Sequence, residues 1–224
     1  MGAVRGFWST WTRSMADTFS QRRDEGQFLA LLPAAIRREL DTSRDSACGL
    51  WPDLSIAWVN RAWQRFGESN GAGRRGVWGV GRSFLDGVGT PLREYYRAHL
   101  LDVLESGHPW ESEYECSSPN LFRLFRMSVE SVGDERALLV RHERIAQRPH
   151  DLSCVRPQPA DARTYVDEHG LIAQCVHCRR VRRAGRAEHW DWVPLWVEAV
   201  PDHASGSLCP QCLATRYPDF VRSA

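Results

Sequence analysis

The chain has 224 residues, of which 42% are hydrophobic, and its 29 basic residues nearly balance its 28 acidic ones. This length and apolar content suit one medium domain with a small second one, and they exclude a wholly disordered chain. A formal net charge of +1 gives no global field that would recruit nucleic acid or an anionic membrane, so any such contact must be local. Every basic residue is arginine, which we interpret as a composition bias.

The sequence shows no sign of membrane insertion or secretion. No apolar run approaches the roughly 18 to 20 residues that span a bilayer, and the N-terminal region lacks the continuous apolar core of a signal peptide. We therefore expect a cytoplasmic protein. The odd number of cysteines, seven, favours reduced thiols and a metal over a disulfide framework.

The N-terminal region predicts an arm followed by a broken helix. Residues 1–26 are polar and predict a loosely ordered arm, although they hold the scattered aromatic side chains Phe7, Trp8, Trp11 and Phe19. Residues 28–40 have apolar positions at helical spacing, with Pro33 expected to start or kink a turn. An apolar stripe on this helix has no obvious partner in the sequence and predicts a homodimer; it consists of Leu31, Leu32, Ile36 and Leu40.

The next hundred residues predict a hairpin, two helices and a meander. Two apolar runs in residues 46–60 flank a Pro-Asp turn, the pattern of a β-hairpin. Residues 61–70 have helical spacing, residues 67–81 form a Gly-rich loop, and a longer helix follows Pro91 and ends at Gly107. Alternating segments at 110–116, 121–132 and 137–142 predict an antiparallel meander, and residues 144–164 read as a linker.

Two C-x-x-C motifs near the C-terminus are the strongest chemical signal in the sequence. Four thiolates suit a tetrahedral zinc ion, and a closed thiolate set leaves no position for catalysis. The site would therefore be structural. The alternatives are two local disulfides, a redox dithiol or an iron centre, and one imidazole could replace a thiolate. The cysteines are Cys175, Cys178, Cys209 and Cys212, and the candidate histidines are His177, His189 and His203.

The 30 residues between Cys178 and Cys209 predict a compact folded insert. Basic residues follow the first motif directly: Arg179, Arg180, Arg182, Arg183 and Arg186. They could contact phosphates, or they could offset the net charge of a zinc tetrathiolate. Three tryptophans of the insert could form a docking surface for a protein partner or fill the interior of the module: Trp190, Trp192 and Trp196. The remaining cysteines are Cys48, Cys116 and Cys154, and Cys116 could be a redox sensor or a buried structural residue.

No catalytic motif is present in the sequence. The glycines of residues 67–81 lack the order of a phosphate-binding loop, and there is neither an H-E-x-x-H helix nor a G-x-S-x-G elbow. We therefore expect a protein that is not an enzyme.

The order of these elements resembles a PAS domain. The residues that carry the resemblance are "SIAWVNRAWQRF", "GRSFLDG" and "ESEYECSSPNLFRLFRMSV". The resemblance implies an α+β fold with a five-stranded antiparallel sheet and helices on one face, used for sensing or dimerisation in bacterial signalling. The tail from "GLIAQCVHCRRVR" to "GSLCPQC" is similar to a four-cysteine module of some PAS-containing bacterial regulators, although Ser205, Gly206 and Ser207 stand where such tails often carry Ser-His-Gly.

The resemblance also implies a ligand pocket between the sheet and the long helix. Trp58, Trp63, Tyr96 and His99 could line it, and the family precedent allows His99 to ligate haem. A core this rich in aromatic side chains leaves little room, so we expect neither haem nor flavin.

These patterns define four regions and a ranking of functions. The regions are an N-terminal arm and helix (1–45), a PAS-like domain (46–143), a linker (144–164) and a small C-terminal zinc-binding module (165–224). The favoured function is a non-enzymatic signal-transduction protein in which a PAS-like sensor or protein-interaction domain and a structural zinc module act on a partner protein. The alternatives are a nucleic-acid-binding transcriptional regulator with a zinc ribbon, and a haem- or flavin-binding PAS sensor.

Overall fold

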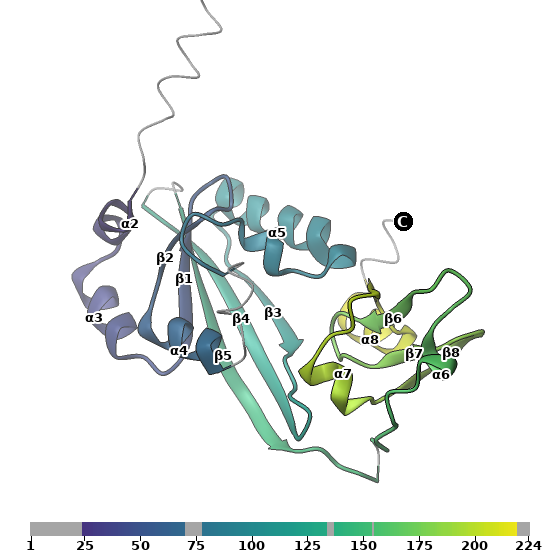
Figure 1. Cartoon of the computed structure of the whole chain (residues 1–224). Coiled ribbons are helices and arrows are strands. Elements are labelled where there is room, and N and C mark those ends of the chain that lie inside the picture. The colour runs from purple at the N-terminus through teal and green to yellow at the C-terminus, as the bar shows by residue number, and fades with distance from the viewer. Residues whose placement is uncertain (1–23, 70–77, 134–136, 154, 219–224) are drawn as a thin grey trace, which may run out of the picture.

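The computed structural model describes residues 24–69, 78–133, 137–153 and 155–218 (Figure 1). It is an α+β protein with two sheets: a five-stranded antiparallel sheet of order β2-β1-β5-β4-β3 and a four-stranded sheet of order β8-β7-β6-β9. The predicted antiparallel sheet is confirmed. The aromatic residues of the predicted N-terminal arm lie outside the described residues.

The predicted hairpin consists of β1 (Ser46–Leu50) and β2 (Ile56–Val59), and helix α4 (Arg61–Ser69) follows it. The buried Asn60 joins these elements: its Oδ1 accepts hydrogen bonds from the backbone N–H groups of Ala47 (3.0 Å) and Trp63 (2.9 Å). Its amide nitrogen donates to the backbone oxygens of Leu40 and Asp45. One side chain therefore fixes both the hairpin and the start of α4, which runs to Ser69 and so extends into the expected Gly-rich loop.

Two short 3-10 helices, η2 (Phe84–Gly87) and η3 (Thr90–Leu92), lead into the long helix α5 (Arg93–Ser106). Gly107 ends α5 at φ 71°, a left-handed conformation that glycine adopts without a steric penalty. The meander then follows as β3 (Trp110–Glu115), β4 (Leu121–Val132) and β5 (Ala137–Pro149).

Strand β5 is longer than the sequence suggests. It pairs with β4 along its whole length, from Ala137 opposite Val132 to Pro149 opposite Leu121. The linker expected from residue 144 therefore starts later. The last residues of β5 are mostly exposed and include the charged Glu143, Arg144 and Arg148, so the apolar alternation that marks a strand is missing there.

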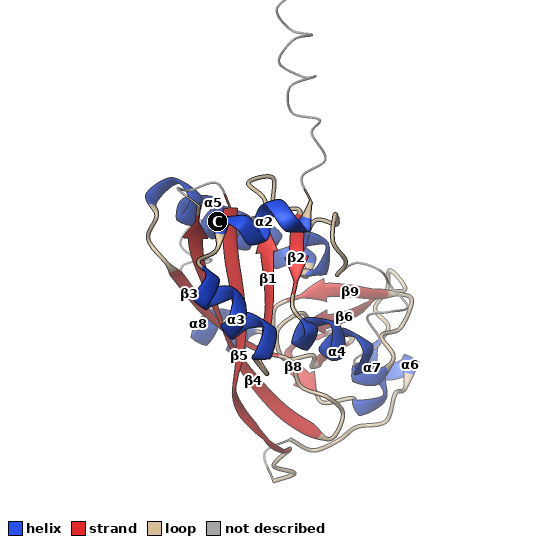
Figure 2. Cartoon of the chain, turned by 90° about the vertical axis from the view of Figure 1, so that its left-hand side faces the viewer, coloured by secondary structure: helices blue, strands red, loops and turns tan. Residues whose placement is uncertain are grey.

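Helices cover both faces of the large sheet, whereas the PAS resemblance implies helices on one face. Leu100 and Val103 of α5 pack on one face, against Met127, Val129 and Val140. On the other side lie α2 (Glu25–Leu31) and α3 (Ala34–Thr42), as Figures 1 and 2 show. Helices α2 and α3 precede the PAS-like region expected at residues 46–143, so they add a layer that the resemblance does not describe.

Phe28 of α2 explains why this second layer is tight. Its ring stacks on Trp58 with centroids 6.1 Å apart, and it meets Trp51 edge-on at 5.9 Å. A Cβ atom at Gly49 would lie 2.2 Å from the Phe28 ring, so only glycine fits there. The apolar stripe thus has a partner in its own chain: Leu32 and Leu40 are buried, and only Leu31 and Ile36 stay half-buried.

The C-terminal module contains the compact insert that the spacing predicts. The elements of the module are, in chain order, α6 (Ala162–Tyr165), β6 (Ile172–Cys175), β7 (Val181–Arg183), β8 (Arg186–Asp191), α7 (Pro194–Glu198), β9 (Ala204–Ser207) and α8 (Pro210–Arg216). The insert consists of the elements from β7 to β9. Strands β6 and β9 pair in parallel, which brings Cys175 level with Ser207, next to the second C-x-x-C motif. The sheet therefore brings together two motifs that are distant in the sequence.

The module packs closely against the larger domain. The side chain of Val176 packs against Gly89, which stands just before η3. A Cβ atom at Gly89 would lie only 2.5 Å from that side chain. Tyr217, directly after α8, is only 1% exposed and belongs to the core between α5 and the large sheet. Arg216 reaches Glu113 of β3 at 2.9 Å. No helix in the described ranges is both long enough and apolar enough to cross a membrane.

Candidate metal centre

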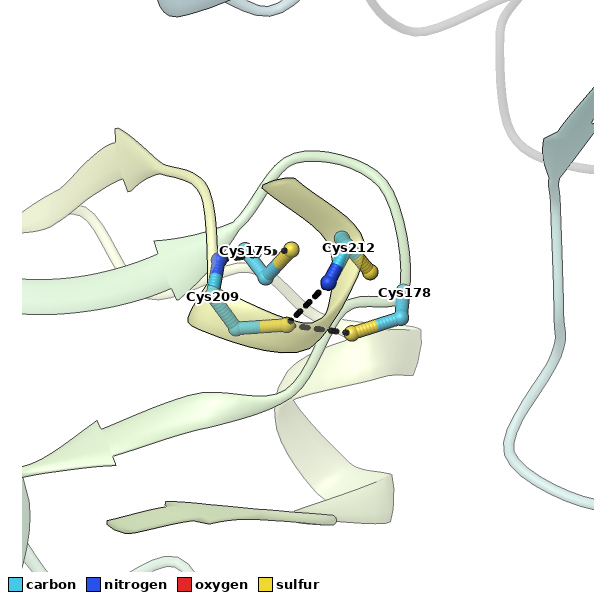
Figure 3. Close-up of side chains that lie close together, drawn as sticks. All are labelled: Cys175, Cys178, Cys209 and Cys212. Atoms are coloured by element: carbon cyan, nitrogen blue, oxygen red, sulfur yellow. Dashed lines mark hydrogen bonds between the residues drawn. The ribbon is translucent and has the colours of Figure 1, made fainter. Parts of the chain in front are cut away.

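The four predicted cysteines come together in space. All four are buried, and their sulfur atoms lie within 4.8 Å of one another (Figure 3). The sulfurs of Cys178 and Cys209 are 3.7 Å apart, close to the roughly 3.8 Å edge of a tetrahedron with metal–sulfur bonds of about 2.3 Å. A disulfide would need about 2.05 Å, and these cysteines are free. The arrangement therefore fits one metal ion held by four thiolates.

The backbone around the cysteines prepares the thiolates for a cation. The N–H of Cys209 donates to the sulfur of Cys175, and the N–H of Cys212 donates to the sulfur of Cys209, each at 3.4 Å. In the first motif, the backbone at Arg179 has φ 65°, which turns the chain so that its N–H bonds to the Cys175 oxygen. Cys209 forms the N-cap of α8. These donors favour the charged form of sulfur.

Hydrogen bonds among the clustered thiols lower the pKa of Cys175 and Cys209 and raise the pKa of Cys178 and Cys212, and two cysteines outside the cluster have raised pKa values. Hydrogen bonds from neighbouring thiols, Cys178 first, lower the pKa of Cys175. Burial raises the pKa of Cys48, and it also raises the pKa of Cys116. Both thiols are therefore held neutral, which suits buried structural cysteines better than redox sensors. Cys154 lies outside the described residues.

The donor set consists of sulfur alone. Neither His177 nor His189 nor His203 belongs to the cluster. His189 and His203 are exposed, whereas His177 is buried with its Nδ1 3.0 Å from the Tyr217 hydroxyl. Four soft ligands in a closed tetrahedron suit zinc best and iron second. With all four positions taken, the ion would be structural.

A second buried group links this centre to the larger domain, and sequence reasoning missed it. Tyr217 hydrogen-bonds to His177 and lies edge-on to Tyr95, with ring centroids 5.5 Å apart. Burial raises the pKa of Tyr217, so its hydroxyl stays protonated and able to donate. An aromatic residue five positions after the last cysteine was the only available signal.

The arginines after Cys178 are engaged largely within the module. Arg183 donates to Asp191 at 2.5 Å, Arg182 lies 3.9 Å from Asp167, and Arg180 donates to the Gln211 side chain at 3.1 Å. The two carboxylate pairs leave less positive charge free for phosphates, whereas Arg180 keeps its charge beside a neutral partner. Arg179 lies near Cys116, whose pKa it lowers in opposition to burial.

The three tryptophans of the insert do not form one exposed surface. Trp192 is buried at 4% exposure, and its ring lies 4.5 Å from that of His150. Trp190 packs against the cysteine cluster, and Trp196 meets Tyr165 edge-on at 5.4 Å. The docking-surface interpretation is therefore wrong for Trp192, and all three side chains supply packing to a module with little apolar core.

The structure does not gather the four predicted pocket residues into one site. Trp58 lies on the opposite face of the sheet, against Phe28. Tyr96 belongs to the core beside α5. His99 is half-buried and stacks on Trp110 with centroids 4.5 Å apart. Trp63 packs near a residue that the sequence did not single out, His142 of β5, at 5.5 Å.

His142 is the unexpected polar residue of the sheet interior. Its Nδ1 lies 2.8 Å from the Tyr114 hydroxyl, and its Nε2 has no hydrogen-bond partner among the described residues. Burial lowers the pKa of His142 to about 4, so the ring is neutral at physiological pH. The sequence offered one signal for this residue, because His142 stands in a strand whose preceding residues are mostly apolar.

No protein-family model matches the sequence, and neither does any curated protein. Several solved structures are similar in fold. The phage VqmA–DPO complex shares 12% identity over 50% of this chain and 52% of that chain, with a TM-score of 0.39. This chain thus spans about half the length of that VqmA chain.

Two of the similar structures are isolated PAS domains. The PAS domain of nitrogen regulation protein NR(II) from Vibrio parahaemolyticus shares 17% identity, with a TM-score of 0.33 over 50% of this chain and all of that one (100%). The PAS domain of the HTR-like protein from Haloarcula marismortui shares 19% identity, with a TM-score of 0.31, and covers 50% of this chain and 96% of that one.

Proposed function

We propose that this chain is a non-enzymatic, cytoplasmic signal-transduction protein. Its PAS-like sheet domain would sense or bind, and its C-terminal module, held by a structural zinc ion, would pass the state of that domain to a partner protein. Support comes from the closed thiolate tetrahedron, which leaves no coordination position for a substrate. The sequence also lacks a catalytic motif.

The observation that carries the proposal is the contact between the two parts. Tyr217 lies in the core beside α5 and hydrogen-bonds to His177, which stands between two of the cysteines. Val176, also between them, lies against Gly89 just before η3. A shift of α5 would therefore move the first C-x-x-C motif directly. Such rigid packed contacts are what transmits a change between two sites.

A partner protein suits the module better than nucleic acid does. Arg182 and Arg183 are paired with carboxylates, which removes two of the five arginines of this run from ready contact with phosphates. Binding to a protein partner should therefore change little between low and moderate salt, whereas phosphate binding would weaken steeply. Measuring complex formation across this salt range distinguishes the two classes.

The coupling can be tested by blocking the Val176 contact. A Cβ atom at Gly89 would lie 2.5 Å from Val176, so Gly89→Val should push the module away from the larger domain. We expect the single unfolding transition of the protein to split into two, followed by circular dichroism and tryptophan fluorescence. The double variant Gly89→Ala, Val176→Gly removes every side-chain atom of Val176, including the Cβ that would lie 2.6 Å away, and should restore a single transition. Two transitions already present in the wild type would contradict the coupling.

We also propose that the protein is a homodimer. Part of the expected stripe is now used inside the chain, but Leu31 and Ile36 still border a groove of about 620 Å³ beside Val132 and Gly133. A second copy would cover these half-buried side chains. Light scattering at high concentration should give twice the monomer mass, and Ile36→Glu should give the monomer. A wild type that is monomeric throughout would refute the dimer.

A further inference from the structure

A cavity separates the far ends of strands β3–β5 from the cysteine module. It has a volume of about 280 Å³, just below the roughly 300 to 1,000 Å³ of small-molecule sites. One wall comes from the large sheet and the segment after β5, and the other comes from the first C-x-x-C motif, Trp192 and α8. Ligand sites occur preferentially at such domain boundaries. The volume limits any occupant to a small molecule.

Aromatic rings line both walls. Phe122 belongs to the sheet wall, and Trp192 belongs to the module, where its ring lies 4.5 Å from that of His150. The His150 Nε2 is 2.9 Å from the Ser118 backbone oxygen, which fixes the ring. Rings held in this way form flat surfaces on which a planar group can pack.

Two guanidinium groups line the cavity from opposite walls outside any salt bridge of the described residues, although Arg180 acts on Glu115 and lowers the pKa of that carboxyl in opposition to burial. Arg148 of β5 lies over the Phe122 ring, 4.7 Å from its centroid, and Arg180 donates to the neutral Gln211 side chain. Neither forms a salt bridge with any carboxylate of the described residues. The third arginine of the lining, Arg216, is already paired with Glu113.

The acidic groups of the lining are less available. Glu115 accepts a hydrogen bond of 2.6 Å from the Ser117 hydroxyl, and burial raises the pKa of Glu115. Asp151 accepts hydrogen bonds from both the N–H and the hydroxyl of Ser153. The thiolates of Cys178 and Cys212 also border the cavity, and one bound cation would offset part of their charge.

We propose that this cavity binds a small planar organic carboxylate, with its charge between Arg148 and Arg180 and its ring against Phe122 and Trp192. Guanidinium–carboxylate hydrogen bonds are charge-assisted and frequently bidentate, which gives them both strength and direction. A ligand held from both walls would fasten the module to the sheet. The site does not depend on the proposed signalling role, because binding is measured without a partner.

The test is isothermal titration of the full, zinc-loaded chain at constant ionic strength with four probes. Benzoate has both charge and ring, cyclohexanecarboxylate has charge without an aromatic ring, benzamide has the ring without charge, and inorganic phosphate has charge alone. We expect benzoate to bind once per chain, with a Kd below about 1 mM. Cyclohexanecarboxylate should bind several-fold more weakly, and benzamide and phosphate should give no saturable heat.

Two variants and one control locate the site. Arg148→Gln and Arg180→Gln, one in each wall, should each weaken benzoate binding about tenfold. Arg144→Gln removes the same charge from an exposed position on the same strand outside the cavity and should change affinity less than about twofold. Zinc content and circular dichroism check that each variant is folded, and the Arg148 variant leaves the cysteine module unaltered.

Three results would overturn the proposal. One is the absence of saturable benzoate heat up to about 10 mM. Another is equal weakening by Arg144→Gln and Arg148→Gln, which would show a general charge effect. The third is phosphate binding as tight as benzoate, which would assign the cavity to inorganic anions. None of these results bears on the zinc site or on the Gly89 contact, so the signalling proposal fails or stands separately.

Discussion

The two parts of this protein are stabilised in different ways. The large sheet carries apolar side chains on both faces, with Leu50, Leu100 and Val129 buried on one and Phe28 and Leu139 on the other. The C-terminal module has only a small apolar cluster, built on Tyr165, Ile172, Val181 and Val193. Since a core of that size supplies little stability, the module must depend on its cysteines and on the neighbouring domain. We propose that a metal held by the four cysteines, together with Tyr217, replaces what an apolar core provides elsewhere.

Removing one thiolate should give the largest effect. Cys212→Ser leaves three soft ligands, so zinc should be lost, together with a binding free energy of about 10 to 16 kcal/mol that is also folding energy for the module. We expect the module to unfold while the large sheet stays folded, measured by zinc content and two-step thermal melting. Cys116→Ser, outside the cluster, is the control and should keep about one zinc per chain.

The same experiment also tests the identity of the metal. Stoichiometric iron in the purified wild type would replace zinc in this account. Oxidised cysteine pairs without any metal would contradict a metal centre altogether.

Shortening Tyr217 should uncouple the two parts without removing the metal. Tyr217→Ala empties a fully buried site beside Tyr95 and should cost about 3 to 5 kcal/mol. Tyr217→Phe keeps the ring but loses the bond to His177, so it should cost only about 1 kcal/mol. Urea unfolding measures both costs. Equal costs would show that the hydroxyl, and not ring packing, holds the parts together.

The large sheet should lose stability in mild acid because of His142. Its pKa of about 4 in the folded protein lies below the ordinary value of 6.5, so protonation favours the unfolded chain once the pH falls below about 6.5. Between about pH 6.5 and 5 this should cost about 2 kcal/mol, and the loss should level off near pH 4. His142→Gln should remove this part of the pH dependence, whereas an unchanged slope would contradict a neutral buried ring.

The smallest effect is expected at His99. Its ring stacks on Trp110 at 4.5 Å, so His99→Ala should cost about 1 kcal/mol of unfolding free energy. We expect a colourless wild type without haem or flavin, and hence no change in its absorption spectrum. A Soret band in the wild type that His99→Ala abolishes would make the large sheet a haem sensor and give the two parts different metals.

Much of the fold follows from local sequence signals. The hairpin at residues 46–59, helix α5 before Gly107 and the meander depend on alternation, spacing and capping within short windows. The cysteine cluster follows from motif spacing, because two C-x-x-C pairs have few other uses in a chain of this kind.

The features that the sequence did not predict depend on long-range contacts. Phe28 closes the second face of the sheet only because Gly49 leaves space for its ring. Strand β5 extends beyond residue 143 because β4 is there to pair with it. Tyr217 looks like an ordinary residue after a short helix until the module is placed beside α5. A single sequence does not indicate which distant parts of the chain pack against each other.

The central claim is that a metal holds the C-terminal module while the large sheet holds itself. Hydrogen exchange measured before and after chelation of the purified protein tests it most directly. We predict that residues 165–217 lose protection, that β4 and β5 keep theirs, and that exchange in α5 near Tyr95 and Tyr96 rises moderately as Tyr217 is released. A module that keeps its protection without metal, or a sheet that unfolds together with it, would contradict this account.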